Sequence, residues 1–225
     1  MKVINAYYDI IDSVNGEMIL KKLERCGRTC YQSGDLANET SAEKFIAGII
    51  KRGHESVLEH VSITAKIVCD RGVTHEIVRH RVASYSQEST RYCNYGKDKF
   101  GNEITFIKPI FWQLEDENYK IWKDNMQRIE ASYLKMIKDE VSPQEARSIL
   151  PNSLKTEIIV TMNLREWRHF FKLRADKAAH PQMKEIAIPM LGTFRSLIPI
   201  VFNDIEYDKD FEAKYENELF RLPLF

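Results

Sequence analysis

The segment RHRVASYSQESTR, residues 79–91, is the most informative stretch of this chain. It gathers three arginines, Arg79, Arg81 and Arg91, and several hydroxyl side chains within a short span. A guanidinium presents a planar fork of N–H donors that matches a phosphate or a carboxylate, and hydroxyls donate or accept beside it. A solvated basic turn is the ordinary explanation for an arginine-rich segment. The fixed order Arg-His-Arg-x7-Ser is much rarer, at roughly one chain of this length in a thousand, and it indicates an anion-binding site.

The composition is that of a chain that can form one folded domain over residues 1–225. A hydrophobic content of 44% is enough for a sizeable core. Lysine and arginine together number 33, as do aspartate and glutamate, so the formal net charge is zero and no overall field attracts polyanions. Anion binding must therefore come from local clusters, and we expect no nucleic-acid partner.

The cysteines and the N-terminus indicate the cellular compartment that we expect for the protein. None of the four cysteines forms a C-x2-C pair, so we expect no metal site and free thiols in a reducing compartment. Charged residues interrupt the N-terminus before the apolar region of a signal peptide can form, and no apolar run reaches the length of a membrane span. The sequence therefore predicts a soluble, cytoplasmic protein without a membrane partner.

Strands and helices are expected in mixed order, which indicates an α/β (α+β) fold. Alternating apolar residues predict a half-buried strand from Val61 to Cys69. Apolar residues from Trp122 to Met136 step by four, three, four and three, which predicts a long helix whose aromatic stripe lies in the core or at a subunit interface. The other expected strands are 3–8, 104–107 and 154–162, and the other expected helices are 17–31, 41–52, 74–81, 143–147, 164–174, 181–199 and a short one within 204–225.

Several of these helices carry start and stop signals. Residues 40–43 form a capping box, and Gly53 is placed to end that helix. Residues 142–145 combine an N-cap, a proline and a glutamate that can reach back. Asn163 is expected to cap the helix that follows it. Residues 79–81 are expected at a helix C-terminus, where the helix dipole favours cations.

Three further regions carry polar side chains that have ordinary explanations when taken alone. In residues 53–56, Gly-His-Glu-Ser, a glycine and histidine at a helix end are usually a cap with a surface histidine. An arginine such as Arg147 on an amphipathic helix is normally solvated or salt-bridged. In the pattern Asn163-Leu164-Arg165-x3-His169-x4-Arg174, the asparagine can cap a helix whose arginines face water.

These three regions and residues 79–91, taken together in this order and at these separations, resemble the flavin-dependent thymidylate synthases. The resemblance covers most of the chain. It implies a single domain with a central mixed sheet flanked by helices. It also implies the FAD-dependent reductive methylation of dUMP to dTMP, with 5,10-methylenetetrahydrofolate as carbon donor and NADPH as reductant. Members of the family are homotetramers whose sites are shared between subunits.

The resemblance also assigns roles to individual residues. His54 is expected near the flavin and the folate. The implied FAD contacts are Ser56, Arg79, His80, Arg81, Gln87, Asn163, Leu164, Arg165 and His169. The implied dUMP contacts are Glu76, Ile77, Val78, Arg79, Gln87, Glu88, Ser89, Thr90, Arg91, Arg147 and Arg174. Gln87 stands where some members carry glutamate, and Glu76 stands where some carry glutamine.

Arg174 is the candidate catalytic residue. Arginine stays protonated in proteins, so it cannot act as a base, but its charge can favour an enolate-like form of the uracil ring. Arg91 and Arg147 are expected to hold the substrate phosphate. Ser89 is the weaker alternative as a nucleophile, because only Glu88 nearby could activate it. The chain lacks a G-x-G-x-x-G motif, so flavin recognition must rest on side chains.

Two other classes of protein could use the same arginines. One is a nucleotide- or nucleic-acid-binding protein without catalysis, which the zero net charge disfavours. The other is a flavoprotein reductase that does not use folate. A yellow purified protein would argue against plain binding, and carbon transfer from labelled folate would argue against a simple reductase.

Overall fold

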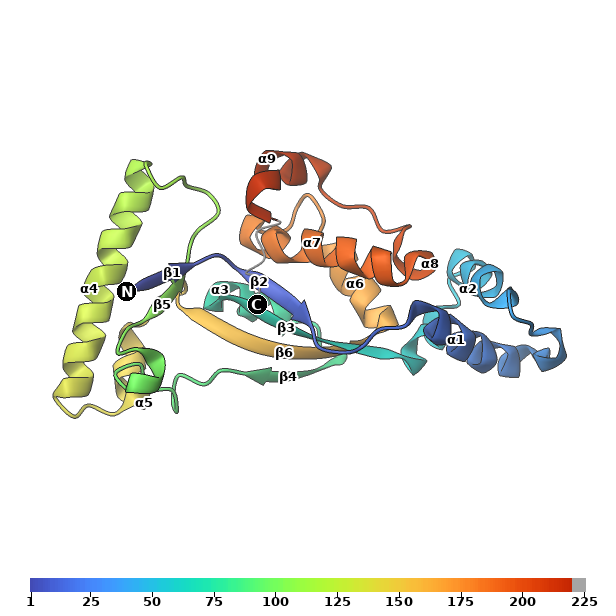
Figure 1. Cartoon of the computed structure of the whole chain (residues 1–225), viewed down its shortest axis with the longest axis horizontal. Helices are drawn as coiled ribbons and strands as arrows, with labels where there is room; N and C mark the ends of the chain where they lie inside the picture. The colour runs from blue at the N-terminus through green and yellow to red at the C-terminus, as the bar shows by residue number, and fades with distance from the viewer. Residues whose placement is uncertain (220–225) are drawn as a thin grey trace.

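The computed structural model describes residues 1–219, which form one antiparallel sheet with helices packed around it (Figure 1). The sheet has the strand order β2-β3-β6-β4. Every neighbouring pair in it is antiparallel. The strands are β2 (Tyr7–Ile10), β3 (Ser62–Asp70), β6 (Lys155–Asn163) and β4 (Ala83–Gln87).

A second, two-stranded sheet lies beside the long helix α4 (Glu117–Lys138) (Figure 1). Strand β1 (Lys2–Ile4) pairs in parallel with β5 (Thr105–Ile107). The α/β fold class is confirmed, but the central sheet is wholly antiparallel and not mixed as expected, since the parallel pairing is confined to this small sheet. The prediction of one strand over residues 3–8 is wrong, because the chain leaves β1 at residue 4 and enters the other sheet at residue 7.

The central strands are amphipathic in the way their sequences predict. Ile63, Ala65 and Ile67 of β3 are at most 1% exposed and face the core, while Thr64 and Lys66 are half-buried. The helices that cover this face bury aromatic side chains against it, and Trp167 donates its indole N–H to the Ile63 carbonyl at 2.9 Å. A hydrogen-bonded indole in a dry core fixes helix and strand in one arrangement.

Most predicted helices are confirmed within a residue or two. The structure has α1 (Gly16–Tyr31), α2 (Ser41–Lys51), α3 (Arg71–Ile77), α5 (Pro143–Ala146), α6 (Leu164–Arg174), α7 (Pro181–Leu197), α8 (Pro199–Phe202) and α9 (Lys209–Leu219). Short 3-10 turns include η2 (Glu55–His60) and η4 (Arg147–Ile149). Within residues 1–219, none of the helices combines the length and apolarity needed to cross a bilayer. The part of the predicted C-terminal helix after residue 219 lies outside the described residues.

Two predicted helix ends differ from the structure. Helix α3 starts directly after β3, because the Asp70 carboxylate accepts the Val73 backbone N–H at 2.8 Å, and it ends at Ile77. Residues 79–81 therefore lie in the loop after the helix. The capping box at residues 40–43 is not formed, since the Thr40 hydroxyl donates to Asn38 at 3.1 Å.

The aromatic stripe of α4 belongs to a second core. Tyr119, Trp122, Met126 and Tyr133 are at most 9% exposed and pack with Phe106 of β5. The expectation that this stripe lies in a core is thereby confirmed within one chain. This second core gives β1 and β5 an apolar support of their own, which explains why β1 pairs there instead of extending β2.

Helix α7 carries a buried glutamate. Glu185 is 8% exposed, and among the described residues its Oε2 atom has no hydrogen-bond partner. Burial, and secondarily the nearby Asp70 carboxylate, raises the pKa of Glu185 to about 8. The native state therefore holds a proton here that the unfolded chain releases at lower pH.

The raised pKa of Glu185 predicts how the variant Glu185→Gln changes stability with pH. A raised native pKa means that the wild-type protein loses stability as pH rises from about 4.5 toward about 8. The glutamine variant lacks this loss, so its stability relative to wild type should increase between pH 5 and pH 8 by on the order of 2 kcal/mol. Urea unfolding at both pH values measures it, with the exposed Glu43→Gln as control. A difference that does not change with pH would contradict it.

Candidate functional site

The loop that joins α3 to β4 carries the Arg-His-Arg sequence. Arg79 and Arg81 are exposed, whereas His80 between them is 3% exposed. The Tyr85 hydroxyl of β4 lies 2.5 Å from the His80 carbonyl oxygen and 2.9 Å from the Ile77 carbonyl oxygen. Burial raises the pKa of Tyr85 to about 12, so the phenol keeps the proton that it donates to this loop. The loop thus directs its histidine inward and its two arginines outward.

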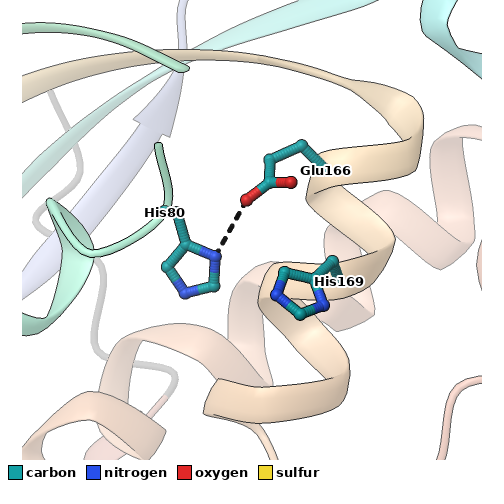
Figure 2. A group of neighbouring side chains, drawn as sticks. All are labelled: His80, Glu166 and His169. Carbon is teal, nitrogen blue, oxygen red and sulfur yellow. Dashed lines mark hydrogen bonds and ion pairs between the residues drawn. The ribbon is translucent and has the colours of Figure 1, made fainter. Parts of the chain in front are cut away.

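The His80 ring lies along one face of α6. Its Nδ1 atom is 3.1 Å from Glu166 Oε1, and its Nε2 atom is 3.2 Å from Arg174 Nε. Figure 2 shows Glu166 reaching from the helix to this ring, with His169 one turn further along. The Phe170 ring centroid is 5.1 Å from that of His80. Positions 166, 170 and 174 share one face of a helix, so a single buried ring can contact all three.

The start of α6 is fixed by the strand before it. The Asn163 side chain accepts the Glu166 backbone N–H at 2.8 Å, which confirms the predicted N-cap. Asn163 is also the last residue of β6 and is paired with Ser62 of β3. The strand register therefore sets where Glu166 and His169 project.

Arg174 is held by three hydrogen bonds. Its Nε donates to His80, its Nη1 lies 2.8 Å from Glu76 Oε2, and its Nη2 donates to the Glu76 carbonyl at 3.1 Å. Desolvation and the Arg174 charge lower the pKa of His80 to about 4. His80 is therefore neutral at physiological pH and accepts from Arg174 without charge repulsion.

Two cavities border this cluster. The first, of about 400 Å³, is lined by Glu55, Glu59, Val82, Asn163, Arg165, Glu166, His169 and Lys172. Its carboxylates have partners, since Glu59 pairs with Arg165 at 2.6 Å and Glu55 pairs with the buried Arg168 at 3.1 Å. The second, of about 420 Å³, has Glu76, Arg174, Asp176 and His180 in its wall. Arg174 thus lies at a wall of one cavity, and His169 at a wall of the other.

The residues after β4 form a separate polar group. Arg147 at the start of η4 donates to the Thr90 hydroxyl at 3.4 Å, and Thr90 directly precedes Arg91 in the chain. Both guanidiniums are exposed, and within residues 1–219 neither has an acidic partner. The Glu88 carboxylate is occupied by Tyr95 at 2.9 Å and Lys155 at 3.0 Å. An anion can therefore bind at Arg91 and Arg147. The carboxylate of Glu88 is already paired and takes no part in such binding.

The other predicted site residues lie in the core, in hydrogen bonds with neighbouring side chains, or on the surface. Ile77 and Leu164 are fully buried in the core, so their side chains line neither cavity. The Gln87 amide nitrogen donates to Thr74 and Thr156 at 3.0 and 3.3 Å. His54, Ser56 and Val78 are exposed, and the Tyr31 hydroxyl is 2.8 Å from His54 Nδ1. One chain therefore brings His80, Asn163, Arg165, His169 and Arg174 around α6, and Arg147 with Thr90 and Arg91 elsewhere.

Sequence analysis missed Glu166 and Lys172 as site residues. Both line the first cavity, and Glu166 also contacts His80. The spacing of Glu166 to Arg174, eight residues, places both on one helix face and could have indicated a shared partner. No local pattern could identify that partner as His80, which lies 86 residues earlier in the chain.

Comparisons with known proteins place this chain in a family. A family described as thymidylate synthase complementing protein matches residues 14–200. The flavin-dependent thymidylate synthase of Pyrococcus furiosus is 41% identical over 166 residues, which cover 73% of this chain and 67% of the relative. That of Geobacter sulfurreducens is 36% identical over 184 residues, covering 79% and 78%. The chain belongs to the flavin-dependent thymidylate synthase family.

The family's fold is also seen in a solved structure. The UMP/dUMP methylase PolB of Streptomyces cacaoi, in complex with 5-Br dUMP, superposes with a TM-score of 0.74 over 90% of this chain and 96% of PolB. The sequence identity is 18%, so the likeness is one of fold. This chain thus shares its architecture with a protein of much lower sequence identity.

The lowered pKa of His80 predicts how stability depends on pH. The native histidine binds its proton only near pH 4, and the unfolded one near pH 6.5, so His80 contributes stability above pH 6.5 that is lost as pH falls toward 4. The variant His80→Gln should therefore lose about 2 kcal/mol less stability than wild type between pH 7 and pH 4.5. Urea unfolding measures the loss, and the exposed His75→Gln serves as control. Equal losses in all three proteins would contradict the prediction.

Proposed function

We propose that this chain catalyses the reductive methylation of dUMP to dTMP in the cytoplasm, with FAD bound, 5,10-methylenetetrahydrofolate as carbon donor and NADPH as reductant. Family membership and the arrangement of Arg174 against His80 carry this proposal. It assigns Arg174 to the pyrimidine, Arg91 and Arg147 to the phosphate, and the first cavity to part of the flavin.

Arg174 has the charge and the free donors that the pyrimidine requires. An arginine carries five N–H donors, and three of those of Arg174 are used by His80 and Glu76. The other two remain for an acceptor such as a ring carbonyl oxygen. A fixed positive charge there stabilises the enolate-like form of uracil, which makes its C5 carbon a better nucleophile. Because Arg174 is already held in place, little reorganisation accompanies this stabilisation.

The phosphate of dUMP would bind to the second group of basic residues. Arg91 and Arg147 are exposed, and the Thr90 hydroxyl next to them is 3.4 Å from Arg147. Two guanidiniums and a hydroxyl match the oxygens of a phosphate monoester. Binding energy from this remote group would orient the ring for reaction.

The residues of the first cavity fit a flavin nucleotide. Asn163, Arg165 and His169 supply donors in its wall, and Arg79 and Arg81 are exposed on the loop that holds His80. These groups can bind the anionic parts of FAD without a glycine-rich loop. When bound and reduced, the flavin supplies the hydride that completes the methyl group. The proposal places each complete site between subunits of a homotetramer, since one chain leaves Arg79 and Arg81 outside the two cavities.

Nucleophilic catalysis by this chain has little support. Ser89 Oγ accepts the Arg91 backbone N–H at 3.3 Å, and the Glu88 carboxylate that could activate it is bound to Tyr95 and Lys155. Complete burial raises the pKa of the Cys69 thiol well above its usual value, and partial burial raises that of Cys93. A thiolate or serine adduct with the pyrimidine is therefore not part of the proposal.

UMP is a second candidate substrate, because PolB, which shares this fold, is a UMP/dUMP methylase. The higher identity to flavin-dependent thymidylate synthases favours dUMP for this chain. Turnover of both nucleotides under the same conditions decides between them.

Carbon transfer from labelled 5,10-methylenetetrahydrofolate tests the proposed function. The purified protein should be yellow, should transfer the label to dUMP, and should consume NADPH only when dUMP and folate are both present. A colourless protein that takes up no added FAD would indicate plain nucleotide binding. A yellow protein that oxidises NADPH without transferring carbon would indicate a simple reductase.

The variant Arg174→Ala tests the role of the guanidinium. Loss of a preorganised charge that stabilises a developing anion should lower kcat by about 100-fold or more. Flavin content should not change, because Arg174 lines a different cavity from Arg165 and His169. Steady-state kinetics and the flavin spectrum measure both quantities, with Arg128→Ala on the exposed side of α4 as control. Normal turnover by Arg174→Ala would remove this residue from the mechanism.

A further inference from the structure

The contacts of His80 fix where its single proton lies. Arg174 can only donate, so His80 Nε2, 3.2 Å from Arg174 Nε, must be the unprotonated nitrogen. The proton of the neutral ring is then on Nδ1, which is 3.1 Å from Glu166 Oε1. A carboxylate accepts hydrogen bonds, so the three groups form a consistent series from Glu166 through His80 to Arg174.

Glu166 is well placed to keep this tautomer. Its side chain is 12% exposed, and that of His80 is 2% exposed, so water competes little for the Nδ1 proton. The Asn163 cap fixes the first turn of α6, from which Glu166 projects. Without an acceptor at Nδ1, the buried imidazole would lose a hydrogen bond. Nothing on that side of the ring would then fix the tautomer that presents an unprotonated Nε2 to Arg174.

The same residues could be taken for a cation site, because donor atoms of His80, Glu166 and His169 lie within 4.8 Å of one another. A metal ion on the Nδ1 side would need the lone pair at Nδ1 and would move the proton to Nε2. That proton would then face the Arg174 Nε–H. Two buried N–H donors would point at each other and neither would have an acceptor there, which is unfavourable. The hydrogen bonds therefore favour a proton between Glu166 and His80, not a metal ion.

We propose that Glu166 is a positioning residue, which holds the His80 imidazole so that its Nε2 atom orients the Arg174 guanidinium toward the pyrimidine. The geometry of α6 supports this, since Glu166 and Arg174 share one face with His80 between them. The identity of the group that Arg174 contacts rests on the proposed function. The orientation of Arg174 by Glu166 does not, because it follows from contacts within the chain.

Replacing Glu166 with alanine and with glutamine separates a hydrogen bond from a charge. Glutamine keeps an acceptor oxygen for the Nδ1 proton but removes the negative charge, whereas alanine removes both. Glu166→Ala should raise the dissociation constant of dUMP and lower kcat, each by about tenfold, while Glu166→Gln should stay within about twofold of wild type. Because Glu166 also lines the first cavity, flavin content is measured in each variant and kcat is expressed per bound flavin. Calorimetry with dUMP and steady-state kinetics on the purified enzyme give these values.

Glu43→Ala is the matched control. Glu43 is the third residue of α2, as Glu166 is the third residue of α6, and both helices have 11 residues. Glu43 is exposed and lies outside the site, so its variant measures the effect of losing an acidic side chain in a first helical turn. We expect it to bind dUMP as wild type does.

The imidazole proton gives a readout that needs no substrate. In ¹⁵N-labelled wild type and Glu166→Gln at pH 7, one of the six histidines should show a slowly exchanging proton on Nδ1 and none on Nε2. That signal should be missing in His80→Gln, which assigns it, and should exchange rapidly with water in Glu166→Ala. If wild type bound no dUMP but gave these spectra, the proposed function would fail and the positioning by Glu166 would stand.

Three results would overturn the inference. Equal losses of dUMP affinity and turnover in Glu166→Ala and Glu166→Gln would show that the charge acts, not the hydrogen bond. Normal behaviour of Glu166→Ala would show that His80 orients Arg174 without help. A wild-type His80 protonated on Nε2 would show that the proton is not between His80 and Glu166.

Discussion

The buried ring of His80 is the contact on which the rest of the site depends. It is 3% exposed, and it receives Arg174 on one nitrogen and faces Glu166 on the other. A neutral imidazole has one donor and one acceptor, and here each has one partner. This joins the loop after α3 to the whole length of α6. The outward direction of Arg79 and Arg81 follows, because the residue between them is fixed inward.

The antiparallel pairing of β3 and β6 makes that contact possible. Asp70 at the end of β3 pairs with Lys155, and Asn163 at the end of β6 pairs with Ser62, so α3 and α6 begin at opposite ends of the pair. Each strand's last residue caps its helix. Arg174 at the end of α6 then meets Glu76 near the end of α3. Two strand ends with capping side chains thus place residues from distant parts of the sequence together.

The sequence predicted what depends on local pattern. Local patterns predicted the alternation of β3, the aromatic stripe of α4 and the Asn163 cap, because burial and capping depend on residues that are close in sequence. The strand break after residue 4 was not, since it depends on a second core around α4. Residues 79–81 were misplaced because Asp70 starts α3 early. Family resemblance pointed to His80 and Arg174, but Glu166 required the folded chain, which brings residues 80 and 166 together.

A crystal structure of the enzyme with dUMP would test the central claim most directly. The account predicts that His80 stays between Glu166 and Arg174, and that the two unused N–H donors of Arg174 contact a carbonyl oxygen of the pyrimidine. It also predicts that the phosphate is bound by Arg91 and Arg147. An Arg174 that leaves His80 and Glu76 to reach the nucleotide, or a pyrimidine bound away from Arg174, would contradict it.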